Sequence, residues 1–488
     1  MAQEPTLVQI TSGSGDDVHP AFVTSAYPFG NGAEEWLAFT RLDLEIDATS
    51  ICVATVAADS IHWPESVYYV ISDSMAYNDF PSIARVRNMI SDVVEDVRGM
   101  LVWQRKVVDN DVYYSYYTGN SWSAPQALAT DPRDDQHPDV VPSDTSFGVV
   151  WEQEGRILYS EFIGGRWSVP ARVSPAADSA NHFPRMLYLF PGYGVTAPMV
   201  IWEMEKPADS TRAIMYSVRW DSGWSAPDTI AWSGDNRSAR FTRGSTTYNL
   251  IVTWESNRGG KWDIYKSAGE TIGDSLYWGT RSELNVLNSG ADNHDFCSII
   301  VPIICNYCAS VSDILYTSAT WRVVSGTSQS IAVSRYNSVS YLTGAPGTEN
   351  IDPAISSGIW YPDGIRIWSV WRNTGIGNPS KLYGTYVDVI EEGVDDRQGV
   401  PNAFSLYPNY PNPFNPSTTF QFVLPHSCIA TLKVFNILGE EIATVLSERL
   451  PTGFHSVEWV PTGLASGVYF YRLEAGPFTE TKKMVLLR

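Results

Sequence analysis

The sequence has no run of about 20 apolar residues, which excludes a helix long enough to span a membrane. It also has no secretory signal, although Met1–Glu4 resembles the remnant of signal cleavage behind an added start Met. We therefore expect a signal peptide that is absent from this chain.

Basic residues are scarce, because 33 Lys and Arg stand against 54 Asp and Glu, for a net charge of −21. From Val400 onward six basic and six acidic residues cancel, so residues 1–399 carry the whole excess. An acidic field of this size repels phosphate backbones and excludes nucleic acid as a partner.

Cysteine is also scarce, and the five residues are Cys52, Cys297, Cys305, Cys308 and Cys428. An odd number excludes a fully paired framework. The Cys305–Cys308 spacing suits a metal or redox pair, but a zinc site needs a second such pair and the sequence has none. Buried thiols, one disulfide within residues 297–308 and a metal site stay open; we predict no metal and no cofactor.

Aromatic and turn-forming residues are abundant, with 18 Trp, 26 Tyr, 36 Gly and 30 Pro. Trp and Tyr suit half-buried pleated surfaces, while Gly and Pro form turns. The composition therefore predicts an all-β fold.

A repeated unit is clearest in residues 135–170, where the β-type runs HPDVV, GVVWEQ, RILYSEFI and RWSVP are separated by short turns. An [Asp/Asn]-x-x-Pro element opens such units at intervals of about 46 to 61 residues, twice in weakened form. Its first residues are Asp17, Asn78, Asp135, Asn181, Asn236, Asn293 and Asn350. This period predicts a seven-bladed β-propeller in residues 1–390, with four strands in each blade.

The second run of most units carries a Trp, which we expect to pack between neighbouring blades rather than to face a ligand. These residues are Trp36, Trp103, Trp151, Trp202, Trp254 and, in the seventh unit, Trp368 and Trp371; Tyr307 lies near the expected place in the sixth.

The seventh unit has no fourth run before a charged stretch at residues 391–401, which we interpret as a linker. Residues 4–12 resemble the ends of other units. We predict that they supply the outer strand of the seventh blade, which closes the ring and removes an exposed edge.

Residues 402–488 change pattern and predict a compact sandwich of about seven strands. They also resemble the type A C-terminal sorting domain of the type IX secretion system, an immunoglobulin-like module. The matching residues are Pro411, Asn412, Pro413, Phe414, Gly439, Gly467, Tyr469, Lys482 and Lys483. The resemblance implies recognition by the outer-membrane translocon and a secreted or outer cell-surface location; a purely structural cap is the alternative.

Residues 1–390 resemble sialidase-like secreted propellers more loosely. The turns before the outer Trp lack the Ser-x-Asp of those proteins, so the resemblance implies a fold rather than an activity. A sialidase site would need converging arginines, and the residues on or near first strands are Arg85, Arg185, Arg240 and Arg243.

The loops that lead into the innermost strands are the best candidates for a site, because seven of them meet around one axis. We predict ligand contacts from His19, Asp135, His137, Asn181, His182, Asn293 and Asn350. The Asp and Asn residues equally suit Asx-turns that cap the loop backbone. The histidines His19, His137 and His294 would suit a metal or pH-sensitive site if they met.

The leading hypothesis is a propeller that binds glycan or protein, and the acidic field favours neutral sugars. A glycoside hydrolase or lyase with its site in the axial funnel and a structural surface-layer component are the alternatives. Converging carboxylates or arginines would favour the enzyme, an apolar-aromatic groove would favour binding, and a self-complementary face would favour assembly.

Overall fold

The computed structural model divides into two compact units, Met1–Glu391 and Glu392–Arg488. It describes residues 7–12, 14–25, 34–44, 48–57, 67–72, 76–86, 97–119, 121–129, 132–143, 146–175, 180–192, 195–242, 250–272, 275–278, 282–283, 291–299, 318–325, 328–335, 338–343, 349–356, 359–361, 364–374, 379–390, 405–406, 409, 414, 418–424, 428–437, 439–450, 453–461, 463–476 and 478–486. The predicted linker 391–401 lies outside these residues. None of the described segments forms a helix that would cross a membrane.

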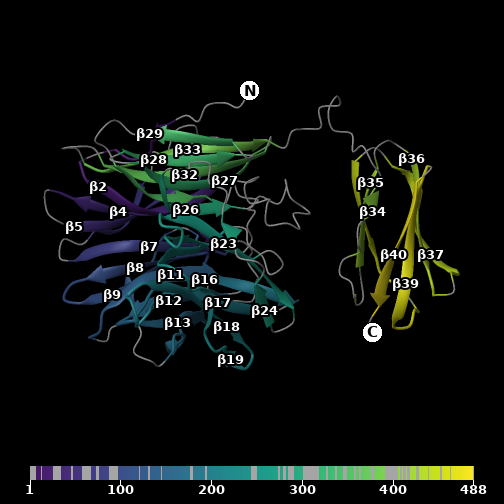
Figure 1. The fold of residues 1–488 in the computed structure, drawn as a ribbon, viewed down its shortest axis with the longest axis horizontal. Helices are drawn as coiled ribbons and strands as arrows, with labels where there is room; N and C mark the ends of the chain where they lie inside the picture. The colour runs from purple at the N-terminus through teal and green to yellow at the C-terminus, as the bar shows by residue number, and fades with distance from the viewer. Residues whose placement is uncertain are drawn as a thin grey trace. The chain divides into compact units, whose positions relative to one another are not determined.

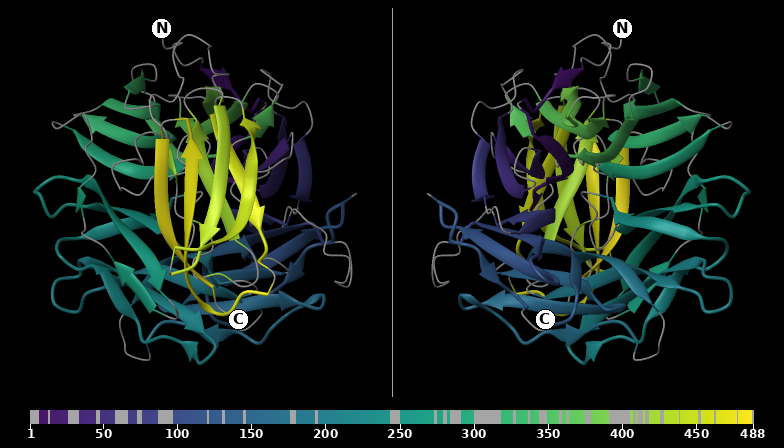
Figure 2. Two further views of the ribbon diagram at one scale, coloured as in Figure 1. Left: turned by 90° about the vertical axis from the view of Figure 1, so that its right-hand side faces the viewer. Right: turned by 90° about the vertical axis from the view of Figure 1, so that its left-hand side faces the viewer.

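The first unit consists, over its described residues, of seven sheets around a common axis (Figure 1). Their strand pairs are antiparallel, except that Thr24–Ser25 runs parallel to Tyr77–Arg85. In Figure 2 the colours pass around the ring from purple through blue and teal to green, which returns beside the purple start. The predicted fold class, a seven-bladed β-propeller followed by an immunoglobulin-like sandwich, is confirmed.

The strands of the first four blades run outward from the axis, and their bounds are as follows. Blade one has β2 (Asp16–Phe22), β4 (Glu34–Asp43), β5 (Ala48–Ala57) and β6 (Val67–Ser72). Blade two has β7 (Tyr77–Arg85), β8 (Gly99–Lys106), β9 (Asn110–Tyr117) and β10 (Gln126–Ala127), and β3 (Thr24–Ser25) pairs with β7. Blade three has β11 (Asp135–Pro142), β12 (Phe147–Gln153), β13 (Arg156–Ile163), β14 (Arg166–Trp167) and β15 (Ala171–Arg172). Blade four has β16 (Asn181–Gly192), β17 (Val195–Glu205), β18 (Arg212–Trp220), β19 (Gly223–Trp224) and β20 (Asp228–Ala231).

The remaining three blades follow the same order. Blade five has β21 (Asn236–Phe241), β22 (Leu250–Ser256), β23 (Asp263–Ile272), β24 (Ser275–Trp278) and β25 (Ser282–Glu283). Blade six has β26 (Asp292–Ile299), β27 (Ser318–Ser325), β28 (Ser328–Arg335) and β29 (Ser338–Thr343). Blade seven has β30 (Glu349–Ile355), β31 (Ile359–Tyr361), β32 (Gly364–Thr374), β33 (Lys381–Ile390) and, at its edge, β1 (Val8–Gln9).

The second strands explain why the blades stack. Every residue of β12 and of β22 is buried, as expected for a strand covered by a neighbouring sheet on both faces. Buried side chains of adjacent blades form shared clusters, such as the one that joins Ile201 of blade four to Trp254 of blade five. The hydrophobic core therefore lies between blades and continues around the ring.

The first and last strands of the unit meet in blade seven. Val8 pairs with Gly384 and Gln9 with Tyr383, and the Ile10 amide donates to the Leu382 carbonyl at 2.8 Å. Ile10 is buried against the core of blades one and seven. A Cβ atom on Gly384 would lie 2.5 Å from Ile10 Cδ1, so the approach depends on this glycine.

The second unit is a sandwich of two antiparallel sheets. One contains β34 (Ser405–Leu406), β35 (Thr418–Leu424) and β38 (Gly453–Trp459). The other contains β37 (Glu441–Leu450), β36 (Cys428–Phe435), β39 (Gly467–Ala475) and β40 (Phe478–Leu486). Its own core includes Phe420, Leu432 and Tyr471, so this unit buries its hydrophobic residues independently.

The sequence assigned the second strand of blade six wrongly. Residues 303–308, with Tyr307, lie outside the described residues, and the strand that pairs with β26 is β27, which carries Trp321. Trp36 is also three residues away from the repeated position, which Phe39 occupies in blade one. Hydrophobic alternation alone does not fix the register when a blade has a longer connection or replaces its Trp.

Candidate functional site

Each innermost strand carries a β-bulge at the same place in its [Asp/Asn]-x-x-Pro element. In blade three the register shifts between Gln136 and Asp139, so that His137 and Pro138 together oppose Trp151. The third residue of every element has a positive φ between 49° and 54°: His19, Phe80, His137, Phe183, Ser238, Asp295 and Asp352. Left-handed backbone at non-glycine residues is costly, so each of the seven bulges must be held in place by its surroundings.

The first residue of the element ties the bulge to the Trp of the second strand. The indole Nε1 donates to the side-chain oxygen of this residue in five blades, at 3.1 Å for Trp103–Asn78, 2.8 Å for Trp151–Asp135, 2.8 Å for Trp202–Asn181, 3.1 Å for Trp321–Asn293 and 3.0 Å for Trp371–Asn350. The Asn amide groups also reach the preceding blade; Asn181 Nδ2, for example, donates to the Gly155 carbonyl at 2.8 Å. These residues therefore join strands and blades.

Blade one replaces this tie with charges. The side chain of Phe39 has no N–H donor like that of the repeated Trp. The fully buried Asp17 instead accepts hydrogen bonds from Arg41 Nε at 2.6 Å and Nη2 at 3.1 Å. Lys381 of blade seven lies 3.8 Å from the same carboxylate, and burial lowers the pKa of this lysine. The seam between the first and last blades thus contains a buried charged cluster.

The residue that follows the repeated Trp supports the bulge of the next blade. Glu203 accepts from the Ser238 amide at 2.7 Å, and Glu255 accepts from the Asp295 amide at 2.8 Å. Gln104 accepts from the His137 amide at 3.4 Å. These side chains offset the strain of the left-handed residues. We did not predict this role from the sequence, although a Glu follows the repeated Trp in three successive blades.

Histidines of the element are paired with carboxylates of the neighbouring strands. Glu152 lies 3.2 Å from His137 Nδ1 and 2.8 Å from His182 Nδ1, and Glu255 lies 2.9 Å from His294 Nδ1. Burial favours protonation of Glu152, but the hydrogen bonds from both histidines outweigh it and lower the pKa to about 2. The hydrogen bond to Glu152 raises the pKa of His182.

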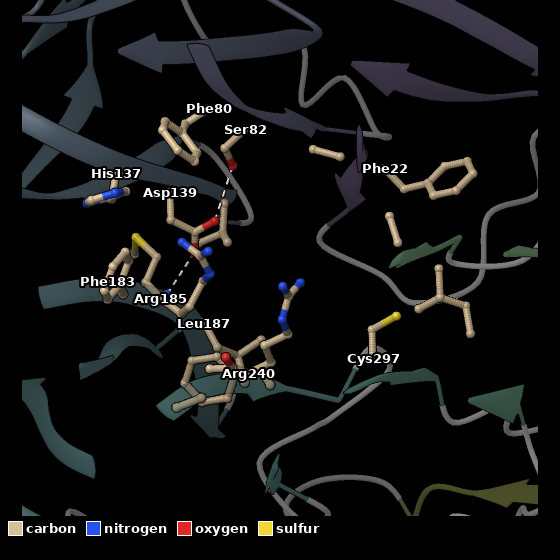
Figure 3. A pocket seen from close by; sticks show the side chains of 18 of the residues that line it. Phe22, Phe80, Ser82, His137, Asp139, Phe183, Arg185, Leu187, Arg240 and Cys297 are labelled. Atoms are coloured by element: carbon tan, nitrogen blue, oxygen red, sulfur yellow. Dashed lines mark hydrogen bonds between the residues drawn. The ribbon is translucent and has the colours of Figure 1, made fainter. Parts of the chain in front are cut away.

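The innermost strands surround a cavity of about 540 Å³, here called the axial cavity (Figure 3). Third residues of four successive elements line it as a continuous set of rings, the aromatic arc: His19, Phe80, His137 and Phe183. Ring centroids are 4.3 Å apart for His19–Phe80, 5.1 Å for Phe80–His137 and 4.4 Å for His137–Phe183. The strained backbone thus presents aromatic side chains to the cavity.

The predicted ligand residues separate into three groups. His19 and His137 line the axial cavity. Asp135, Asn181, Asn293 and Asn350 are at most 2% exposed and form the ties described above, inside the strands rather than in the loops before them. His182 contacts Glu152 and is not among the lining residues.

The three axial histidines do not meet. His19 Nδ1 lies 2.6 Å from Asp79, and His137 and His294 contact different glutamates. Among the described residues no group of three His, Cys, Asp or Glu side chains is arranged to hold a metal ion. Cys52, Cys297 and Cys428 form no disulfide, while Cys305 and Cys308 lie outside the described residues.

Two of the four arginines considered above converge on the axial cavity. Arg185 and Arg240 line it from the neighbouring strands β16 and β21; in Figure 3 the Arg240 side chain extends into the open centre, and the Arg185 side chain lies beside Asp139. The Arg85 guanidinium lies over the Trp36 ring at 4.7 Å, away from the lining residues, and Arg243 is outside the described residues.

In the second unit, two of the predicted sorting residues are structural. Phe414 is buried and pairs with Leu486 of the last strand, and its amide donates to the Val485 carbonyl at 2.9 Å. Tyr469 is also buried, and its hydroxyl donates to the Ala465 carbonyl at 2.8 Å. Pro411, Asn412 and Pro413 lie outside the described residues.

The remaining sorting residues lie at turns and on the last strand. Gly439 adopts a φ of 83° in a turn, a conformation that favours glycine, and Gly467 begins β39. Lys482 is partly buried and pairs with Glu480 at 2.9 Å, while Lys483 is exposed.

Residues 409–487 match the family model of the secretion system C-terminal sorting domain. The second unit is a type IX sorting domain. The chain is therefore a secreted or cell-surface protein with a β-propeller fold, and type IX secretion handles it through residues 409–487.

Several solved structures are similar to the chain at low identity. The β-propeller domain of the trilobed protease from Pyrococcus furiosus is 6% identical, with a TM-score of 0.42 over 78% of this chain and 96% of that one. An ulvan lyase bound to a GlcA–Rha3S unit is 8% identical, with a TM-score of 0.43 over 77% and 95%. A neuraminidase-like protein of A/flat-faced bat/Peru is 10% identical, with a TM-score of 0.37 over 80% and 95%. No curated protein matches the sequence.

Proposed function

We propose that the propeller binds a glycan in its axial cavity. The observation that carries the proposal is the aromatic arc, four ring side chains held on consecutive blades by left-handed backbone. A cavity of about 540 Å³ is within the range of small-ligand sites. Sugar rings combine apolar C–H faces with hydroxyl groups, and aromatic faces beside charged and hydroxyl side chains complement both.

The polar side chains of the axial cavity support the same proposal. Ser82, Asp139 and Asp352 line it together with the arc and offer hydroxyl and carboxylate groups to sugar hydroxyls. The aromatic arc accepts neutral and acidic sugars alike, because stacking on an aromatic face does not depend on the charge of substituents at the edge of the sugar ring.

The test is binding of the full chain to an immobilised glycan array, followed by calorimetry on the glycans that bind. We expect Phe80→Ala and Phe183→Ala each to reduce affinity about tenfold or more, because each removes one ring of the arc. Tyr341→Ala, which removes an exposed ring from the outer strand β29, is the matched control and should bind normally. Equal affinity of all three variants, or the absence of any bound glycan, would contradict the proposal.

The alternative of a glycan-active enzyme is favoured by one observation. Glu203 lines the axial cavity, and burial raises its pKa despite the hydrogen bond from Arg212, as suits a general acid. The same array glycans decide between the two functions. Release of products by the wild type and not by Glu203→Gln would establish catalysis.

A further inference from the structure

The fifth residues of the seven elements form a second ring of side chains in the axial cavity: Ala21, Ser82, Asp139, Arg185, Arg240, Cys297 and Ala354. Blades six, seven and one contribute only small side chains. Blades two to five contribute polar or charged ones, and the two arginines are adjacent in this order. This ring of fifth residues therefore has one side of small side chains and one side of polar and charged side chains.

The two arginines, here called the arginine pair, form no ion pair with an acidic side chain over the part of the chain that the structure describes. Arg185 makes one hydrogen bond, from Nη1 to the Pro184 carbonyl at 3.1 Å. Among the described residues no carboxylate lies within ion-pair distance of Arg185 or Arg240. By contrast, Arg212 is paired with Glu203 at 2.7 Å.

The carboxylate of Asp139, which belongs to the same ring of fifth residues, already accepts two hydrogen bonds. Asp139 accepts from the Met186 amide at 2.9 Å and from Ser82 Oγ at 3.2 Å (Figure 3). Burial lowers the pKa of Arg185, the Asp139 charge opposes this change, and the Arg240 charge adds to it. Two guanidinium groups without an ion-pair partner in one cavity are costly even with the charges of Asp139 and Glu203 nearby, and an anion between them would lower that cost.

We propose that the arginine pair binds the carboxylate or sulfate group of an acidic sugar; this rests on the proposed glycan binding. Guanidinium groups match both anions with paired hydrogen bonds. The sugar carries one such group within the cavity, because the carboxylates of Asp139 and Asp352 line the same space and would repel a second. The arginine pair thus outweighs the general acidity of the chain, which by itself favours neutral sugars.

The test uses the full chain on an array that holds neutral glycans beside their uronate- and sulfate-bearing counterparts. We expect binding to acidic glycans, with affinity reduced at least tenfold in Arg185→Met and in Arg240→Met. Arg166→Met, on the exposed turn strand β14, is the matched control and should leave affinity unchanged. Uronate and sulfate glycans on the same array identify which anion is preferred.

A second measurement separates failure of this inference from failure of glycan binding. Equal binding of neutral and acidic counterparts, or unchanged affinity in both arginine variants, overturns the anion site and leaves glycan binding intact. If no glycan binds, melting is followed against inorganic sulfate and chloride at equal ionic strength. A saturable rise with sulfate that the double variant lacks supports the anion site; equal responses overturn it.

Discussion

At the scale of single residues, the clearest consequence concerns Glu152, which joins two blades through His137 and His182. Its pKa is about 2 in the folded protein, below the ordinary value of 4.5, so its contribution to stability is present above pH 4.5 and is lost toward pH 2. The pKa of His182 is raised, so its contribution is complete below pH 6.5 and is lost as the pH rises through the higher folded value.

We therefore expect the melting temperature of the wild type to increase when the pH is lowered from 8 to 6. Glu152→Gln removes the negative charge that stabilises protonated His182. The melting temperature of this variant should therefore increase less over the same change in pH. It should also destabilise the protein by about 1–3 kcal/mol at pH 6, because buried donors lose their charged acceptor. Calorimetry at both pH values measures the melting temperature and the free energy of unfolding. Glu154→Gln, on the exposed turn after β12, serves as the control. Identical pH responses of Glu152→Gln and wild type would contradict this role of the Glu152–His182 pair.

The left-handed residues are a feature that could not be predicted from the sequence. The [Asp/Asn]-x-x-Pro spacing located all seven elements, and two of the histidines within them, His19 and His137, line the axial cavity. The sequence did not reveal the bulge, because a Pro after His137 is equally compatible with an ordinary loop. Without the bulge, the first residue seemed exposed, whereas in the structure Asp135 is buried against Trp151.

At the scale of secondary-structure elements, β1 depends on a strand more than 370 positions later in the sequence, as the Leu382–Thr11 hydrogen bond shows. Deleting residues 2–12 removes β1 and buried Ile10. We expect the melting temperature to fall by about 5–15 °C, from the lost apolar burial and the unpaired edge of β33. Deleting residues 2–6 spares β1 and serves as the control. A melting temperature equal to that control would show that β1 is dispensable.

The same scale explains which strands the sequence identified. Trp103, Trp151, Trp202 and Trp254 are buried in second strands as expected, because the aromatic repeat reflects the packing between blades. The pattern failed where packing uses another residue. Phe39 replaces Trp in blade one, and the compensating Arg41–Asp17 bond spans two strands, a contact that periodicity along one strand does not encode.

At the scale of the whole molecule, the two units differ in charge and in role. The excess of acidic residues belongs to residues 1–399, whereas the sorting domain is neutral overall. The last strand, β40, pairs with β39 over its whole length and completes the core through Met484 and Leu486. The sorting domain therefore has the features of a separately folding module.

We expect residues 400–488 to direct a fused periplasmic reporter out of a host that has type IX secretion. Fusion of the same reporter to residues 1–391 should leave it in the periplasm, since that unit lacks the matched family. Fractionation of cells and medium measures the outcome. Periplasmic retention of the reporter with residues 400–488 would show that these residues are insufficient for export.

The pairing of β1 with β33 also affects how the protein responds to proteolysis. A protease that removes the first 12 residues leaves the other six blades intact. It exposes the unpaired edge of β33 in blade seven. Such a margin recruits matching strands from other molecules. An intact N-terminal strand thus protects the protein against self-association as well as unfolding. A propeller in which every blade is formed by consecutive residues would not depend on its N-terminal strand in this way.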